Sequence, residues 1–262
     1  ITTLSWGLGY FGMPHILLRF MAIEDEKKLK LSRRVATIWV VISLFVAVFI
    51  GVIGYTMSKV GALEMLTGSN SETIIVKISA LLSQHGVIFA LLAGVILAGI
   101  LASTMSTSDS QLLAASSAVS SDILGAFRKD SSNKNGSMAA ARITLLVISV
   151  VAAFIARNPD SSVFAIVSFA WAGFGAAFGP VVLFSLFWKR TNKWGALAGM
   201  VCGGSMVFIW KYLIRPLGGI WNIYELLPAF LIACAAIVIV SLLTPKPSKE
   251  IEEEFDRVAQ MK

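Results

Sequence analysis

The chain has 262 residues, of which 56% are hydrophobic and only 14% are charged, and its formal net charge is +7. Soluble domains carry about 25% charged residues, so this composition excludes an ordinary soluble domain and indicates a polytopic membrane protein. The positive charge is explained by its distribution over the loops and does not indicate nucleic-acid binding. Cys202 and Cys234 lie in separate apolar runs without a CxxC pattern, so we interpret them as inert, buried thiols.

The first residues form an apolar segment that is interrupted by helix-breaking residues. The sequence starts at Ile1 without an initiator methionine or a signal peptide, so we expect a fragment that lacks its N-terminal part. Residues 5–15 contain three closely spaced glycines and then Pro14, which weaken or interrupt a helix. A lipid-facing helix has no partners for the backbone groups that are freed in this way. The segment is therefore either a loop at the membrane edge or a helix broken inside a protein-lined cavity, as in secondary transporters.

Two aromatic residues of this segment bear on that choice. Trp6 and Tyr10 have the i,i+4 spacing that places two side chains on one face of an α-helix. On one face they would offer aromatic walls to a small ligand. Aromatic residues are also common at the membrane–water interface, so an interfacial belt remains the alternative.

Six full spans are predicted after the broken segment, since about 20 apolar residues cross a bilayer. The first spans residues 35–58, and a short amphipathic helix is expected at 72–83. The second begins near residue 86 and continues as a hydroxyl-rich helix through 103–121 to about 127. The other four are residues 138–156, 163–188, 194–214 and 226–243, and a surface helix is expected at 250–260. We therefore divide the chain into a transmembrane domain, 1–244, and a cytoplasmic tail, 245–262.

The loops predict how the protein is oriented in the plasma membrane. Most of the 22 lysine and arginine residues fall in alternate loops, at residues 19–34, 128–142 and 189–193, and in the tail. The opposite side holds the few that remain: Lys59, Lys77, Arg157, Lys211 and Arg215. Lysine and arginine are enriched in cytoplasmic loops, so we expect the first group and the C-terminus in the cytoplasm.

Small residues repeat at four-residue spacing in two of the predicted spans. One stripe holds Gly195, Gly199 and Gly203, and the other holds Gly175 and Gly179. Such stripes allow the backbones of membrane helices to approach closely, and we interpret both as helix-packing surfaces.

The hydroxyl-rich helix has one polar face. Ser103, Ser106, Thr107 and Ser110 have the spacing i, i+3, i+4 and i+7. Serine and threonine in membrane helices commonly bond to carbonyls of their own helix, which is the structural interpretation. Hard cations such as sodium prefer oxygen ligands, so the same face could instead provide two hydroxyls and one carbonyl to a cation. The residues alone leave both interpretations open.

Asp109 is the only acid well inside a span, and it lies about 110° from the centre of the hydroxyl face. It is a functional candidate, or it pairs with a base near the cytoplasmic side. The chain contains neither HExxH nor GxSxG, and the two histidines, His15 and His85, are far apart. An intramembrane enzyme would need a paired acid or a serine–base dyad, so we predict that the protein is not an enzyme.

Three motifs together resemble the sodium:solute symporter family. They are the run of residues 5–15 continuing through 19–22; Met105-Ser106-Thr107 followed by Gln111-Leu112-Leu113; and residues 169–173 with 187–190. The resemblance implies a fold of two inverted five-helix repeats with extra terminal helices. This chain would hold the second repeat, beginning within its broken first helix, and two C-terminal helices. Its partners would be the lipid bilayer and the missing N-terminal half of the same chain.

The resemblance also implies a function and its residues. The substrate side of the site corresponds to Trp6, Tyr10 and Pro14. The sodium ligands correspond to the hydroxyls of Ser106 and Thr107 and the carbonyl of Ser103, with further ligands from the first repeat. We therefore predict sodium-coupled symport of a small zwitterion, with L-proline as the favoured substrate. Symport of another solute such as pantothenate, or a channel or sensor on the same fold, stays open.

Overall fold

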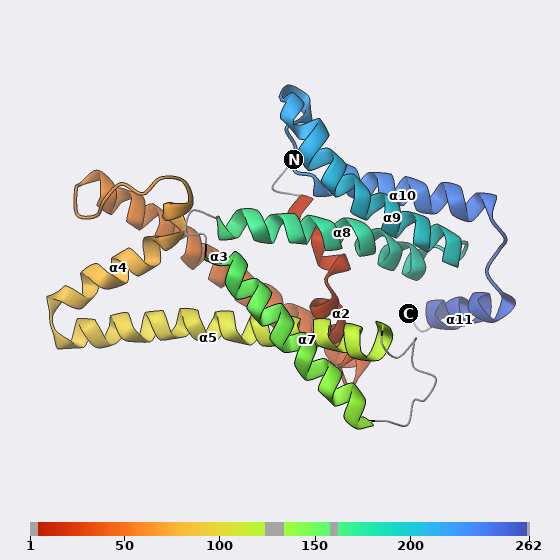
Figure 1. Cartoon of the computed structure of the whole chain (residues 1–262), viewed down its shortest axis with the longest axis horizontal. Coiled ribbons are helices and arrows are strands. Elements are labelled where there is room, and N and C mark those ends of the chain that lie inside the picture. Colours follow the sequence, from red (N-terminus) through yellow and green to blue (C-terminus); the bar gives the residue numbers. More distant parts are fainter. Residues whose placement is uncertain (1–4, 124–133, 158–161, 261–262) are drawn as a thin grey trace. The chain divides into compact units, whose positions relative to one another are not determined.

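The computed structural model describes residues 5–123, 134–157 and 162–260. Within these ranges the regular secondary structure is helical and contains no strand (Figure 1). Six helices have the length and apolar composition to cross a membrane: Leu29–Lys59, Val87–Ile123, Met138–Ile155, Val163–Phe187, Lys193–Leu217 and Leu226–Leu243. This confirms the predicted all-α polytopic membrane fold and its six spans. Residues 124–127, where the second span was expected to end, lie outside the described ranges.

Two compact units make up the chain, Ile23–Val163 and Ile1–Ala22 with Phe164–Lys262. The unit Ile23–Val163 contains α3 (Leu29–Lys59), the short α4 (Ile74–Leu82), α5 (Val87–Ser117) and α7 (Lys134–Ile155). The last turns of the α5 span, Ala118–Ile123, are π-helical. The short helix predicted at 72–83 corresponds to α4.

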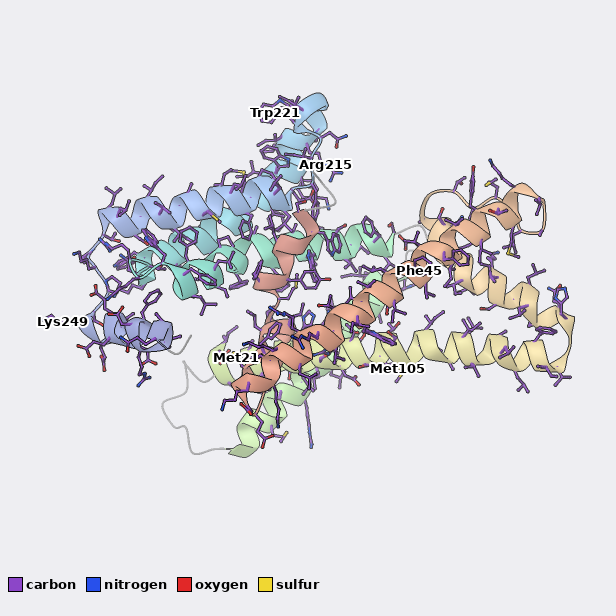
Figure 2. All side chains as sticks on the ribbon, turned by 180° about the vertical axis from the view of Figure 1, so that it is seen from behind. Met21, Phe45, Met105, Arg215, Trp221 and Lys249 are labelled. Atoms are coloured by element: carbon purple, nitrogen blue, oxygen red, sulfur yellow. The ribbon has the colours of Figure 1, made fainter. Side chains whose placement is uncertain are left out.

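The long helices of this unit expose mostly apolar side chains. Figure 2 shows side chains standing out along α3 and α5, and Phe45 and Met105 are 69% and 63% exposed. Where α3 meets α4, Gly54 is buried against the side chain of Ile74. Apolar surface on spans of this length is what a lipid-facing helix requires.

The other unit is built around the broken segment and three spans. It contains η1 (Trp6–Gly12), α2 (Pro14–Met21), α8 (Val163–Phe187), α9 (Lys193–Ile209), α10 (Leu226–Leu243) and the tail helix α11 (Lys249–Gln260). After α9 the chain passes through a π-helical turn, Trp210–Ile214. The buried core consists of Ala172, Ala176, Val207, Tyr224, Leu226, Ala229 and Phe230. Three of these seven residues are alanines, because α8, α9 and α10 approach closely.

The glycine stripes make these close approaches, as predicted. A Cβ atom at Gly203 would lie 2.2 Å from the carbonyl oxygen of Ala176 in α8, and one at Gly199 would lie 2.4 Å from Ile237 in α10. On α8, a Cβ atom at Gly175 would lie 2.6 Å from the Cα atom of Gly9 in η1. The stripes therefore bring α9 against both neighbours and seat the broken segment directly on α8.

The turn between α8 and α9 also holds the start of the tail. Asn192 caps α9 by accepting the N–H of Gly195 at 2.8 Å, and its amide donates to the Thr244 hydroxyl at 2.7 Å. Arg190 donates to the Thr244 carbonyl at 2.8 Å. Lys189 pairs with Asp256 of α11 at 2.5 Å, and this hydrogen bond raises the pKa of Lys189. The predicted surface helix is thus present and tied to the α8–α9 turn.

Candidate functional site

The first segment is a broken helix in the structure. Trp6–Gly12 form a 3-10 helix, and Met13 then leaves helical geometry with φ −85° and ψ 112°. Pro14 occupies the first turn of α2, where its missing N–H is no loss. Because a proline disfavours helical dihedrals in the residue before it, Pro14 accounts for the extended Met13. The break therefore follows directly from the sequence.

The arrangement of Trp6 and Tyr10 differs from the one that their spacing predicted. In a 3-10 helix, with about three residues per turn, residues i and i+4 point about 120° apart, so they do not share a face. Both nevertheless contact Trp171 of α8. The Trp6 ring stacks on Trp171 with centroids 5.5 Å apart, and the Tyr10 ring meets it edge-on at 4.9 Å. Trp171 thus joins the two aromatic residues that the helix itself separates.

Trp6 and Tyr10 differ in how much surface they leave for a ligand. Trp6 is partly buried and also stacks near Phe164, at 5.6 Å, and Tyr224, at 5.9 Å. Tyr10 is 50% exposed. Tyr10 is therefore the more accessible aromatic surface, and Trp6 lies in the layer of rings that supports it. Pro14 is exposed at the start of α2.

The backbone of the broken segment finds partners on α8. The Trp171 indole N–H donates to the carbonyl oxygen of Trp6 at 3.0 Å. This bond requires Gly9, because a Cβ atom there would lie 1.9 Å from the same indole nitrogen. A Cβ atom at Gly12 would lie 2.3 Å from the Phe174 carbonyl oxygen. Glycine is thus required at both positions by close contact with α8.

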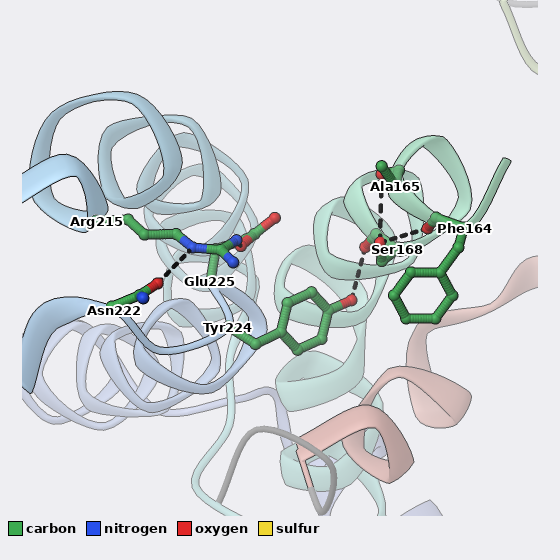
Figure 3. A network of polar contacts seen from close by, with 7 residues as sticks. All are labelled: Phe164, Ala165, Ser168, Arg215, Asn222, Tyr224 and Glu225. Carbon is green, nitrogen blue, oxygen red and sulfur yellow. Dashed lines mark hydrogen bonds and ion pairs between the residues drawn. The ribbon is translucent and has the colours of Figure 1, made fainter. Parts of the chain in front are cut away.

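A polar network joins the residues just before α10 to α8 (Figure 3). The buried Tyr224 donates its hydroxyl to the Ser168 carbonyl at 2.6 Å. Its neighbour Glu225 is 2% exposed and pairs with Arg215 at 3.0 Å, and Arg215 also donates to Asn222 at 3.2 Å. Burial, and secondarily the charge of Glu225, raise the pKa of the Tyr224 hydroxyl. A higher pKa favours the protonated hydroxyl, which is the form that donates this hydrogen bond.

The predicted cation ligands lie on α5, in the other unit. Thr107 donates its hydroxyl to the Ser103 carbonyl at 3.2 Å, and Ser110 donates to the carbonyls of Ser106 and Thr107. These are the within-helix bonds of the structural interpretation. If two oxygen atoms bind one hard cation at about 2.4 Å each and at right angles, they lie ~3.4 Å apart. The Thr107 hydroxyl oxygen and the Ser103 carbonyl oxygen are 3.2 Å apart, so this pair also suits the cation interpretation. Ser103, Ser106 and Thr107 are all exposed on α5.

Asp109 is exposed on α5, which is α-helical at this position. Within the described parts of the chain it has no ion-pair partner, and no group of three or more histidine, cysteine or acidic residues suits a metal ion. Cys202 and Cys234 are free thiols of intermediate burial.

Of the six residues predicted for the site, the structure joins Trp6 to Tyr10 through Trp171, and Ser103 to Thr107.

Sequence reasoning assigned no role to Trp171, Phe164 or Tyr224. Trp171 belongs to a motif that carried the family resemblance, so a signal for it was present. Tyr224 stands beside an acid just before a span, which gives no hint that its ring meets Trp6. Only the packing of α8 and α10 around η1 reveals these contacts.

The chain matches known symporters over almost its whole length. The profile of the sodium:solute symporter family matches residues 1–203. The chain is 40% identical to the sodium/proline symporter of Salmonella typhimurium over 256 residues, which are 97% of this chain and 49% of that relative. It is 39% identical to the osmoregulated proline transporter OpuE of Bacillus subtilis over 249 residues, which are 95% of this chain and 49% of that relative.

The chain thus spans about half the length of the curated relatives that it matches. No solved structure matches it significantly. The family profile covers well over half of the chain. The chain belongs to the sodium:solute symporter family.

Proposed function

We propose that this chain is part of a sodium-coupled symporter for L-proline. The observation that carries the proposal is the similarity, at 38–40% identity over nearly the whole chain, to proteins named as sodium/proline symporters. The broken segment beside an aromatic layer supports it, because broken helices form the binding sites of secondary transporters.

The proposed substrate site uses the exposed ring of Tyr10, with Trp6 and Pro14 on the same segment. Tyr10 gives an apolar wall for a pyrrolidine ring, while Trp171 packs against the Tyr10 ring and is itself stacked on Trp6. The backbone groups released at the 3-10 to α-helix break suit the charged ends of a zwitterion.

In the proposed sodium site, Ser106 and Thr107 give hydroxyl oxygens and Ser103 gives its carbonyl. The Ser106 hydroxyl makes no hydrogen bond within the described residues, so its oxygen is available to a ligand. Further ligands come from the part of the protein outside this chain. Sodium and proline then bind more tightly together than alone, and this coupling is reciprocal. The positive loops and the C-terminus face the cytoplasm.

The sodium site is tested in the complete protein that carries this chain. Replacing a ligand oxygen, in Ser106→Ala or Thr107→Ala, should raise the sodium concentration for half-maximal proline uptake about tenfold, because a charge-assisted contact is lost. Thr104→Ala and Ser108→Ala are matched controls, since their hydroxyls donate to carbonyls four residues earlier at 2.9 and 3.0 Å, as the Thr107 hydroxyl does. Equal sodium dependence in all four variants would exclude this site.

A further inference from the structure

The turn between α9 and α10 takes no direct part in the proposed sodium and substrate contacts, yet it reaches the broken segment. The Arg215 guanidinium donates a hydrogen bond to the side chain of Asn222 and forms an ion pair with Glu225 (Figure 3). These two contacts link the beginning of the turn to its end. The Glu225 carboxylate is almost fully buried, and a buried carboxylate needs such a partner. The ion pair therefore fixes the backbone beside Tyr224, directly before α10.

Tyr224 contacts two elements of the aromatic layer at once. Its ring stacks near Trp6 at 5.9 Å with an interplanar angle of 18°. Its hydroxyl donates to the carbonyl of Ser168, one turn before Trp171 on α8. The side chain is 6% exposed, so it has little freedom to leave these contacts. Trp6 in turn stacks on Trp171, which supports Tyr10.

We propose that Tyr224 is a positioning residue for the substrate site. It holds Trp6 against Trp171 and so fixes the ring of Tyr10, which faces the solute. This inference rests on the proposed function. Through Tyr224, the α9–α10 turn contributes to solute affinity. A residue that only filled the core at the start of α10 would not affect the affinity for solute.

The test is a double-substitution cycle in the complete protein, read as initial rates of labelled-proline uptake per amount of protein in the membrane. Tyr224→Leu removes the ring and should raise KM about three- to tenfold, since aromatic pairs contribute this much, with the maximal rate within about twofold. Tyr224→Phe keeps the ring and should restore KM to within about twofold. Trp6→Leu should raise KM, and Trp6→Leu with Tyr224→Leu should raise it no further.

The control is Tyr212→Leu, which removes a ring of the same unit that is 60% exposed and contacts Phe169 instead of Trp6. It should leave KM unchanged. The inference is overturned if Tyr224→Leu and Tyr212→Leu have the same KM, or if the effects of Tyr224→Leu and Trp6→Leu on KM multiply in the double variant.

A purely structural role would lower the membrane amount and leave the KM of the remaining protein unchanged, which would also overturn the inference. If Tyr224→Leu does not reach the membrane, Tyr224→Met fills the space without a ring and replaces it in the cycle. Sodium-dependent uptake by the unaltered protein tests the proposed function separately, before any variant is compared.

Discussion

At the scale of single residues, Gly9 is one of the two positions in the broken segment, with Gly12, where close contact with α8 leaves no room for a side chain. In Gly9→Ala the new Cβ atom would overlap the Trp171 indole, so Trp171 has to move and its bond to the Trp6 carbonyl is lost. We expect a rise of about tenfold in the KM for proline, or loss of uptake, in the complete protein. Gly7→Ala is the control, because its Cβ atom would meet nothing within 4 Å. Equal kinetics in the two variants would contradict this placement of Trp171.

The break in the first segment could be predicted from its residues, whereas the contacts of its side chains could not. Pro14 and the glycines determine where the helix is interrupted. The relation of Trp6 to Tyr10 depends on the number of residues per turn, and nothing in the local pattern distinguishes a 3-10 from an α-helix here. Their common contact, Trp171, lies more than 150 residues away in sequence, so only the packing of α8 reveals it.

At the scale of elements, the contact of α9 with α8 gives a prediction about stability. Gly203→Ala places a methyl group against a backbone carbonyl that cannot rotate away, so the helices must separate. We expect a loss of about 1–3 kcal/mol in stability, seen as a lower midpoint of thermal unfolding in detergent. Gly204→Ala adds the same methyl group in ordinary contact, 3.9 Å from Ala177, and should leave the midpoint unchanged or slightly higher.

The ion pair of the α9–α10 turn gives a second prediction at this scale. Arg215→Ala leaves the carboxylate of Glu225 buried without its partner, which should lower stability by about 2–4 kcal/mol. The double variant Arg215→Ala with Glu225→Ala removes the buried charge as well, so part of the stability should return. A double variant less stable than Arg215→Ala would show that the uncompensated charge is not the cause. The measurement is again the unfolding midpoint in detergent.

The helices themselves were largely predictable, because each span is a long apolar run and each glycine stripe has a regular spacing. The π-helical turns at Ala118–Ile123 and Trp210–Ile214 were not, since they leave the apolar pattern unchanged. The tie between Asn192 and Thr244 was equally hidden, because it joins two loops about 50 residues apart.

At the scale of the whole molecule, the charge distribution predicts an orientation that can be tested. In a complete protein from which Cys202 and Cys234 have been removed, single cysteines replace Ser69, between α3 and α4, and Ser248, before α11. A membrane-impermeant maleimide added to intact cells should label the cysteine at position 69 and not the one at 248. The reverse pattern would contradict the orientation. Lysed cells, in which both should react, provide the control.

The expected meeting of solute and cation also concerns the whole molecule. Tyr10 and Thr107 belong to different units, so neither local pattern nor the packing within a unit predicts that solute and cation meet. That expectation comes from the resemblance to the family. Reciprocal coupling, in which sodium lowers the KM for proline and proline lowers the sodium requirement, is its thermodynamic consequence.

The most direct test of sodium-coupled proline symport is the uptake of labelled proline by the complete protein in membrane vesicles. An imposed inward sodium gradient should drive proline to a higher concentration inside than outside. Replacing sodium with potassium should abolish this accumulation. Equal accumulation in both salts, or entry of proline that never exceeds the outside concentration, would contradict sodium-coupled symport.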